Sequence, residues 1–224
     1  QLAPELRLTR PGEADPAEVE FALCFEPPDD AFAPYPNLRL ISSIAAGVDA
    51  ILACPSRPKH LPVIRMRDRG QARRMAGFAL WHILHWHRRF DRLLAAQAEG
   101  RWDRTANDPT TPETIGIGIL GFGLLGRELA RALAPLGYAT RSHSRTAPEP
   151  EAGVAHFHGE DGLAPFLAGT DILVNLLPNT AATRGLLSAS LFAAMPEGAR
   201  IVNLGRGAQL VEADLLAALD SGHI

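Results

Sequence analysis

The chain has 224 residues, 46% of them hydrophobic and 21% charged, which is the composition of a globular protein with one large domain or two modest ones. The formal net charge of −3 argues against a nucleic-acid-binding protein, because such proteins usually carry a basic face. No apolar run approaches the ~20 residues of a membrane span and no signal-peptide pattern is present, so we expect a cytoplasmic protein that does not enter a membrane.

The first 67 residues predict a small α/β domain. Mostly apolar runs at residues 19–25, 38–44 and 63–66, separated by proline-rich loops, predict three short strands. The second run ends at Ala45-Ala46-Gly47-Val48-Asp49, a segment where a helix can begin. Cys24 and Cys54 are expected to be free thiols, since no secretory signal favours a disulfide, which is the alternative.

A change of pattern near Arg67 predicts a domain boundary, with domains at residues 1–67 and 68–224. Residues 71–98 hold no proline and only one glycine, so they predict a single long helix. Its apolar face is predicted from side chains that recur at spacings of three and four, namely Met75, Ala79, Ile83, Trp86 and Phe90.

From Thr114 onward, strand and helix patterns alternate. Strands are predicted at residues 115–120, 138–142, 171–177 and 200–204, and helices at 124–133, 162–168, 188–195 and 212–221, with Ser188 as a helix N-cap. Such alternation predicts a parallel sheet with right-handed crossovers. We therefore expect a doubly wound α/β (Rossmann) domain from about residue 68, preceded by a smaller, flavodoxin-like α/β domain.

The segment Gly121-Phe122-Gly123-Leu124-Leu125-Gly126 predicts a dinucleotide-binding loop, because it follows a predicted strand and opens a predicted helix. The first glycine permits the tight turn, the second lets the backbone approach a pyrophosphate, and the third lets helix and strand pack closely. The free amides of the helix N-terminus then bind the phosphates. A glycine-rich turn that binds nothing is the alternative.

The end of the second strand predicts which nicotinamide cofactor is preferred. An NAD site usually carries an acidic residue about 20 residues beyond the glycine loop, but this chain has no acid between Arg131 and Pro148. It has Ser144, Arg145 and Thr146 instead, and a guanidinium with neighbouring hydroxyls suits a 2′-phosphate. We expect NADPH to be preferred over NADH; a solvated Arg145 with no ligand is the alternative.

Several segments together resemble one family. They are residues 119–126 (ILGFGLLG), 175–180 (NLLPNT), 201–207 (IVNLGRG) and 212–219 (EADLLAAL). This set resembles the D-isomer-specific 2-hydroxyacid dehydrogenases. The Ser144-Arg145-Thr146 triplet and the Leu-Leu-Pro-Asn-Thr segment resemble the glyoxylate/hydroxypyruvate reductase branch in particular. The reaction that the resemblance implies is reduction of a small 2-oxoacid to the 2-hydroxyacid by hydride transfer from NADPH.

The resemblance also implies roles for individual residues. Arg206 matches the catalytic arginine that holds the 2-oxoacid and polarises its carbonyl, a task that suits a planar, always charged guanidinium. The backbone amides of Ala46, Gly47 and Val48 match the site of the substrate carboxylate. The remaining matches line the cofactor and are Leu177, Pro178, Thr180, Leu204 and Gly205.

Two further expectations follow from the resemblance. The family's catalytic Glu and His come from motifs that do not occur in this chain, so we expect the chain to end before them. The resemblance implies a substrate domain at residues 1–67 and a dinucleotide-binding domain at residues 68–224, and we expect both to be incomplete. The long helix corresponds to one at the family's dimer interface, so we expect a homodimer. His82, His85 and His87 lie on that helix without a carboxylate at ligand spacing, and we expect no metal site.

Two other functions remain as alternatives. An NAD-dependent D-3-phosphoglycerate-type dehydrogenase would carry an acid at the second strand end, which this chain lacks. A dehydrogenase-like protein that senses NAD(P) would bind the cofactor with slow turnover, and Arg206 argues against it without excluding it.

Overall fold

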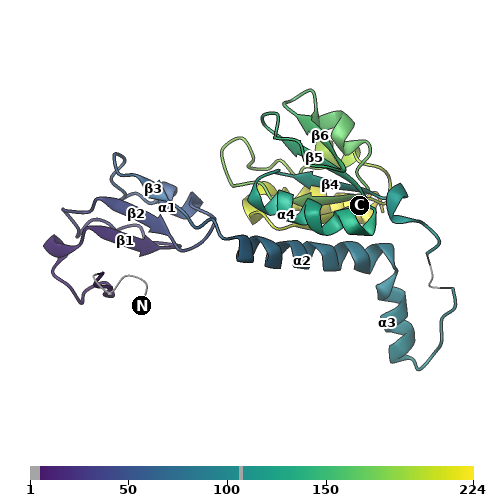
Figure 1. Ribbon diagram of the computed structural model, residues 1–224, viewed down its shortest axis with the longest axis horizontal. Helices are drawn as coiled ribbons and strands as arrows, with labels where there is room; N and C mark the ends of the chain where they lie inside the picture. Colours follow the sequence, from purple (N-terminus) through teal and green to yellow (C-terminus); the bar gives the residue numbers. More distant parts are fainter. Residues whose placement is uncertain (1–5, 106–107) are drawn as a thin grey trace. The chain divides into compact units, whose positions relative to one another are not determined.

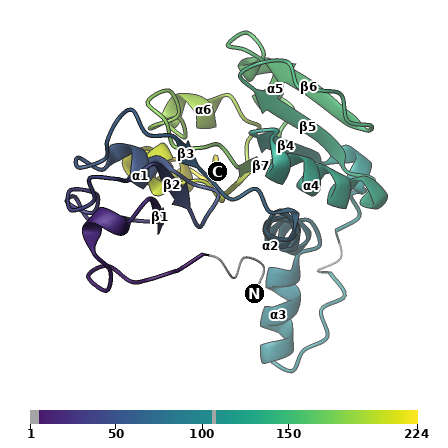
Figure 2. The ribbon, with the colours of Figure 1, turned by 60° about the vertical axis from the view of Figure 1, so that its left-hand side comes forward.

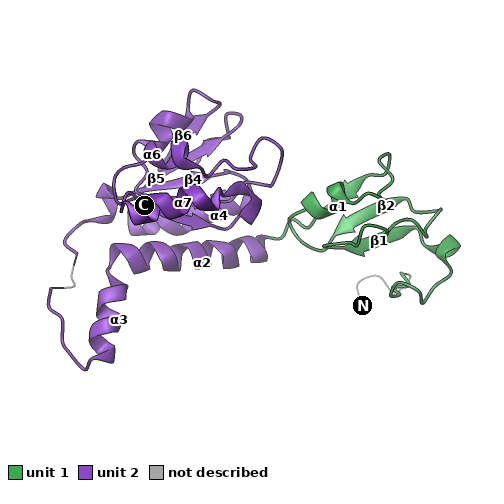
Figure 3. Cartoon of the chain, turned by 180° about the vertical axis from the view of Figure 1, so that it is seen from behind, with its two compact units in different colours: residues 1–68 green, residues 69–224 purple. Residues whose placement is uncertain are grey.

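The computed structural model describes residues 6–105 and 108–224. It divides into two compact units, Gln1–Asp68 and Arg69–Ile224 (Figure 3). We refer to them as unit 1 and unit 2. The assignment of unit 1 as a substrate domain and unit 2 as a dinucleotide-binding domain stays a prediction. None of the helices in the described ranges combines the length and the apolar character needed to cross a lipid bilayer.

Unit 1 is a small parallel sheet covered by short helical segments. Its elements are a 3₁₀ turn η1 (Pro16–Glu18), strands β1 (Phe21–Cys24), β2 (Leu40–Ser43) and β3 (Val63–Ile64), and helix α1 (Asp49–Ala53). The strands lie in the order β1-β2-β3, and both pairs are parallel. Ile41 and Ile51, both fully buried, form the centre of its core. Cys24 and Cys54 are free thiols, as expected.

Unit 2 contains the remaining elements (Figure 1). Its helices are α2 (Arg69–His87), α3 (Phe90–Ala98), α4 (Leu124–Leu133), α5 (Leu163–Leu167), α6 (Ala189–Ala193) and α7 (Glu212–Asp220). Its strands are β4 (Gly116–Leu120), β5 (Ala139–Ser144), β6 (Val154–His158), β7 (Ile172–Asn175) and β8 (Arg200–Asn203). Three 3₁₀ turns complete it: η2 (Pro112–Thr114), η3 (Ala134–Leu136) and η4 (Gly207–Gln209).

The five strands of unit 2 form one parallel sheet in the order β6-β5-β4-β7-β8. The chain therefore runs outward from β4 to β6 and then returns to the other side of β4 with β7 and β8. This reversal is the topological switch point of a doubly wound fold, beside which ligands bind at the carboxyl ends of the strands. The predicted Rossmann-type α/β fold is confirmed.

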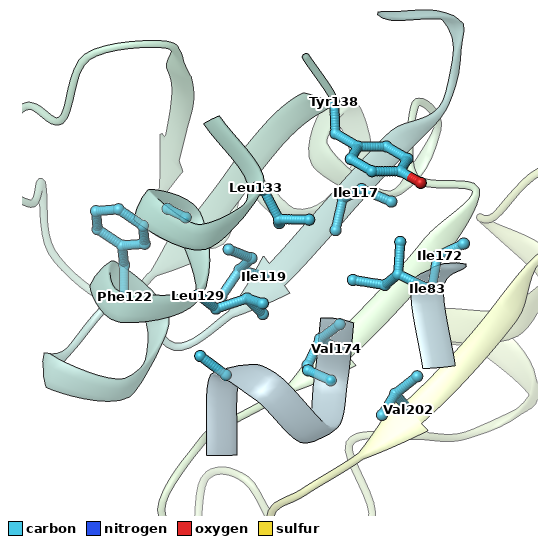
Figure 4. Packing of buried hydrophobic residues seen from close by; sticks show 13 residues of the cluster. Ile83, Ile117, Ile119, Phe122, Leu129, Leu133, Tyr138, Ile172, Val174 and Val202 are labelled. Carbon is cyan, nitrogen blue, oxygen red and sulfur yellow. The ribbon is translucent and has the colours of Figure 1, made fainter. Parts of the chain in front are cut away.

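Each face of this sheet is covered by a different layer of helices. Successive strand residues point to opposite faces, so they pack against different layers. Ile117 and Ile119 of β4 face α2 and α4, which lie side by side beneath the sheet (Figures 1 and 2). The close view shows Ile83 of α2 packed among these strand side chains (Figure 4). Leu120 points to the other face, where α5 and α6 cover the sheet.

The prediction of one helix over residues 71–98 is wrong. The helix breaks between α2 and α3, where Arg89 has a left-handed backbone with φ of 53°. No glycine or proline marks this break in the sequence. The end of α2 is instead fixed by the buried His87, whose Nδ1 lies 2.7 Å from the Tyr138 hydroxyl and whose Nε2 lies 3.1 Å from the Thr110 carbonyl oxygen.

The predicted apolar face of this helix is only partly correct. Ala79 and Ile83 are buried, but Trp86 and Phe90 are 38% and 39% exposed. The buried stripe of α2 consists of Ala72, Ala76, Ala79, Ile83 and His87. Small alanines occupy most of this stripe, which lets α2 pack closely against α4 and leaves the bulky aromatic side chains outside the core.

Two smaller differences concern β6 and α6. Strand β6 is absent from the predicted elements because it is an edge strand with two histidines, which weakens the apolar signal. Ser188 stands at the N-cap position of α6, but its side chain makes no capping hydrogen bond. Asp214 of α7 takes that role, since its Oδ2 accepts from the Ala189 amide at 2.8 Å.

Candidate active site

The predicted site residues of unit 2 all follow the carboxyl ends of four neighbouring strands. The glycine loop follows β4, Ser144 ends β5 and precedes Arg145 and Thr146, the segment 176–180 follows β7, and the segment 204–206 follows β8. Because the strands are parallel and adjacent, these segments share one edge of the sheet. The fold thus brings the predicted cofactor residues and Arg206 to the same edge.

The glycine loop has the backbone geometry that its sequence predicts. Gly121 has φ of 95°, in the left-handed region that side chains with a Cβ rarely adopt. A Cβ on Gly126 would collide with the carbonyl oxygen of Gly121. Glycine at 126 therefore allows the first turn of α4 to lie directly against the end of β4.

Gly123 differs from the other two glycines, because a Cβ placed there would meet no atom within 4 Å. It is the N-cap of α4, and the first turn of that ten-residue helix carries no acidic side chain. The start of α4 therefore presents backbone amides and the positive end of the helix dipole toward open space. This environment fits the pyrophosphate of a dinucleotide.

Phe122, between the glycines, is a packing residue. Its ring is 6% exposed and lies edge-on to His156, with ring centroids 4.9 Å apart. The guanidinium of Arg127 covers the same ring at 5.0 Å. Phe122 therefore holds the loop by its side chain, and a contact of this residue with a cofactor would come from its backbone.

His156 connects β5, β6 and the segment between them. Its Nε2 accepts a hydrogen bond from the Glu151 amide at 3.0 Å, so the neutral ring carries its proton on Nδ1 and donates to the Ser142 hydroxyl at 2.7 Å. Burial lowers the pKa of His156, and the positive charge of Arg127 acts in the same direction. The neutral imidazole thus stabilises the connection between β5 and β6.

Two arginines of α4 hold the same connection. Glu151 accepts from Arg131 Nε at 3.0 Å and from Arg127 Nη1 at 3.2 Å. These hydrogen bonds, that of Arg131 above all, lower the pKa of Glu151. Because α4 also begins at the glycine loop, these contacts fix the segment after β5 relative to the predicted phosphate site.

The predicted 2′-phosphate residues lie at the beginning of this segment. Ser144 donates its hydroxyl to the Thr146 carbonyl oxygen at 2.8 Å, which shapes the turn. Arg145 and Thr146 are exposed. Among the described residues, no hydrogen bond or ion pair engages the Arg145 guanidinium, so it is available to an anionic ligand.

The segments after β7 and β8 are held by buried amide side chains that the sequence did not single out. Asn175 donates to Asn203 Oδ1 at 2.9 Å, and its own Oδ1 accepts from the Leu177 amide at 3.2 Å. The half-buried Arg206 donates its backbone amide to Gln209 Oε1 at 2.8 Å. Asn175 is marked in the sequence only as a polar residue at the end of an apolar strand, and Gln209, in η4, has no such signal.

The rest of the segment after β7 forms a compact turn. Thr183 donates its hydroxyl to the Pro178 carbonyl oxygen at 2.6 Å and accepts from the Thr180 amide at 2.9 Å. Leu177 packs against the core on the face of the sheet that α5 and α6 cover, and Leu204 packs against the core on the face of α2 and α4. The backbone of both segments is therefore fixed before any ligand binds.

The remaining predicted residues, Ala46, Gly47 and Val48, belong to unit 1 and lie between β2 and α1. The buried Ser43 organises this turn: its hydroxyl accepts from the Ala45 amide at 3.1 Å and donates to the Gly47 carbonyl oxygen at 2.7 Å. Within the described ranges, no hydrogen bond is recorded for the amides of residues 46–48. Three unengaged amides in one turn suit a carboxylate ligand.

The described residues contain no group of three or more His, Cys, Asp or Glu side chains arranged to hold a metal ion. Of the three histidines on α2, His87 is engaged in the core, as described above.

Comparisons with known proteins agree with this geometry. The family model for the D-isomer-specific 2-hydroxyacid dehydrogenase NAD-binding domain matches residues 80–224. The chain is 40% identical over 225 residues to glyoxylate/hydroxypyruvate reductase A of Serratia proteamaculans (strain 568), covering 98% of this chain and 70% of that protein. Unit 2 thus has the fold and the sequence of a domain that binds a nicotinamide cofactor.

Solved structures show the same similarity. A D-isomer-specific 2-hydroxyacid dehydrogenase from Xanthobacter autotrophicus Py2, in complex with NADPH and MES, is 43% identical with a TM-score of 0.88, covering 96% of this chain and 68% of that one. An NADPH-dependent glyoxylate/hydroxypyruvate reductase from Sinorhizobium meliloti, in complex with NADP and sulfate, is 33% identical with a TM-score of 0.87, covering 95% and 67%.

Gly123 and Gly126 of the loop should respond differently to substitution by alanine. In Gly123→Ala the new Cβ meets no protein atom, so we expect an unchanged melting temperature without cofactor and a loss of NADPH binding of about tenfold or more. In Gly126→Ala the Cβ collides with Gly121, so we expect both stability and binding to fall. Thermal melting with and without NADPH measures both effects. Full NADPH binding by Gly123→Ala would contradict the predicted role of this position.

His156 should make stability depend on pH. Its pKa is lowered in the folded chain, so the unfolded chain takes up this proton more readily. Neutral His156 therefore contributes its full stabilisation above the pKa of an ordinary histidine, about 6.5. This stabilisation is lost as the pH falls from there toward the lower pKa of His156 in the folded chain. We expect the melting temperature to fall more steeply with acidification in the wild type than in His156→Gln. The exposed His60→Gln is the control, and equal slopes in all three proteins would refute the assignment.

Proposed function

Because the chain belongs to the D-isomer-specific 2-hydroxyacid dehydrogenase family, we propose that it reduces a small 2-oxoacid of the glyoxylate or hydroxypyruvate type to the 2-hydroxyacid, with NADPH preferred over NADH. One observation carries the proposal: the glycine loop and the Arg206 turn lie at the same edge of one parallel sheet. The glyoxylate/hydroxypyruvate reductase activity for which the Serratia relative is named and the NADPH or NADP bound in two similar structures support it.

The chain's own residues have distinct roles in this reaction. Arg206 holds the substrate carboxylate and polarises the 2-oxo group, since its guanidinium stays charged and offers paired N–H donors. Within unit 1, the amides of residues 46–48 are proposed to bind a substrate carboxylate. NADPH, when bound, would supply the hydride that adds to C2, and a general acid would supply the proton that the carbonyl oxygen takes up.

The cofactor's phosphates are assigned to the loop from Gly121 to Gly126, with the amides of Leu124 and Leu125 at the start of α4. Leu177, Pro178 and Thr180 are assigned to its ribose and nicotinamide side, together with Leu204 and Gly205. Because Phe122, His156 and the arginines of α4 fix the neighbouring segments, the loop needs little rearrangement to bind. Binding a preformed site costs less conformational entropy than ordering a flexible one.

The NADPH preference is assigned to Arg145, with Ser144 and Thr146 beside it. Arg145 is exposed and unengaged among the described residues, so it can form charge-assisted hydrogen bonds to a 2′-phosphate without breaking an existing contact. No acidic side chain follows β5 before Glu149 to repel that phosphate.

The first experiment compares NADPH and NADH oxidation by the full-length protein with glyoxylate and with hydroxypyruvate. We expect turnover with both acids and a higher kcat/KM for NADPH. Arg145→Ala should raise the KM for NADPH about tenfold or more and leave that for NADH almost unchanged, because only the 2′-phosphate contact is lost. Arg10→Ala, an exposed arginine of unit 1, is the control.

Each outcome bears on a different part of the proposal. Equal use of the two cofactors would refute the preference and leave the reaction standing. Tight NADPH binding without turnover of any 2-oxoacid would refute the reaction and favour the cofactor-sensing alternative. An Arg145→Ala protein with wild-type affinity for NADPH would show that another group reads the 2′-phosphate.

We also infer that the protein forms a homodimer through α2 and α3. These helices expose six large apolar side chains, each between 38% and 55% exposed: Phe78, Trp81, Trp86, Phe90, Leu93 and Leu94. An apolar surface of this kind is typical of an interface between subunits.

Sedimentation velocity tests the dimer. We expect the wild type to sediment as a dimer and Trp81→Asp as a monomer. Burying an unpaired carboxylate in an apolar interface would cost more free energy than the contact returns. Leu216→Asp, on an equally exposed position of α7, should remain a dimer. A wild type that stays monomeric at all concentrations would contradict the proposal.

A further inference from the structure

Gln209 lies between the two segments that carry the proposed substrate and cofactor contacts. Its side chain is fully buried. Oε1 accepts the Arg206 backbone amide at 2.8 Å, while Nε2 donates to the carbonyl oxygens of Leu177 at 3.3 Å and Pro178 at 3.1 Å. One side chain therefore contacts both the Arg206 turn and the segment after β7, 31 and 32 residues away in the sequence.

The chemistry of the neighbours fixes the orientation of this amide. The Arg206 amide can only donate, so it must face Oε1. The carbonyls of Leu177 and Pro178 can only accept, so they must face Nε2. Glutamine is the side chain of this length that offers an acceptor at one end and two donors at the other. A leucine could make none of these contacts, and an ionised glutamate could make only those of the acceptor.

The surroundings of Gln209 are adapted to it. Asn175, which is 1% exposed, donates to Gln209 Oε1 at 3.0 Å, so that oxygen accepts two hydrogen bonds. A Cβ on Gly205 would collide with Gln209 Oε1 and lie 2.7 Å from Asn175 Nδ2. Glycine at 205 therefore lets the backbone beside Arg206 approach this pair of amides.

We propose that Gln209 is a positioning residue that couples the Arg206 turn to the Leu177–Pro178 segment. One buried amide side chain then sets both the orientation of the Arg206 guanidinium and the position of the Leu177–Pro178 segment, which we assign to the nicotinamide side of the cofactor. This inference rests on the proposed function, since it gives Gln209 its role through Arg206 and the cofactor segment. A shift of either segment changes the geometry at which substrate and cofactor meet, and small misplacements of reacting groups lower rates strongly.

The test uses two substitutions of Gln209 and one matched control in the full-length protein. Gln209→Leu removes all four hydrogen bonds, whereas Gln209→Glu keeps the acceptor and, when ionised, loses the donors. Thr170→Val is the control: Thr170 is fully buried in unit 2 and donates its hydroxyl to the Phe166 carbonyl oxygen at 2.7 Å, away from the site. The Thr170→Val variant loses a buried hydrogen bond but keeps the shape of the side chain.

For Gln209→Leu we expect the KM for the 2-oxoacid and the Kd for NADPH to rise together, with a loss in kcat/KM of about 10-fold to 100-fold. Thr170→Val should lose stability and keep both constants. Without any ligand, hydrogen exchange of the Arg206 amide should become faster in Gln209→Leu and stay unchanged in Thr170→Val, because only the first loses the acceptor for that amide.

Gln209→Glu provides a readout that a purely structural role would not give. Burial raises the pKa of the introduced carboxyl group above that of an exposed glutamate, so it stays protonated to a higher pH. A protonated carboxyl can again donate to the Pro178 carbonyl. Its activity relative to the wild type should therefore rise as the pH is lowered from about 8 to about 5.5. The same ratio for Gln209→Leu should stay flat.

Two results would overturn the proposal: kinetic constants of Gln209→Leu equal to those of Thr170→Val, or a ratio for Gln209→Glu that does not change with pH. Failure of the proposed function gives a different result, namely a wild type that reduces no 2-oxoacid. In that case the NADPH Kd and the exchange of the Arg206 amide still decide whether Gln209 couples the two segments.

Discussion

The close approach of α4 to the end of β4 is the contact on which the site of unit 2 depends. It is possible because Gly126 has no Cβ to collide with the Gly121 carbonyl. The approach places the amides of the first turn of α4 at the carboxyl edge of the sheet, where the segments after β5, β7 and β8 also begin. A helix start displaced by the width of a methyl group would leave the amides that we propose to bind phosphate out of line with the other segments.

Around this contact, polar side chains are buried in order to position backbone rather than to stabilise the core. Asn175 and Gln209 are almost fully buried, which is costly for amide groups unless each finds partners. Both find them in the loops that follow β7 and β8. His156 serves the connection after β5 in the same way, and its lowered pKa is a consequence of that burial. Such networks restrict each loop to one conformation, which a site requires before it can bind with little loss of entropy.

Features that depend on local sequence could be predicted. The three glycines, the missing acid after β5 and the alternation of strands and helices are local patterns, and they were enough for the fold and for a nicotinamide cofactor. The break at Arg89 could not be predicted, because it depends on the anchoring of His87 by Tyr138, 51 residues away. The cap of α6 by Asp214 was missed for the same kind of reason, since the capping side chain lies 25 residues beyond Ala189. The edge strand β6 was missed because its two histidines weaken the apolar signal of a strand.

The sequence by itself determined most of the strands and helices of unit 2, the glycine loop proposed to bind phosphate, and Arg206 as the candidate catalytic residue. Each of these depends on a pattern or residue type within one short stretch of the chain. Only the tertiary structure decided which side chains hold these parts together. Gln209 is an ordinary polar residue in the sequence, and the two carbonyl groups to which its side chain donates lie 31 and 32 residues before it. Hydrogen bonds are directional and short, so a contact between distant segments exists only once folding has brought donor and acceptor within about 3 Å of each other.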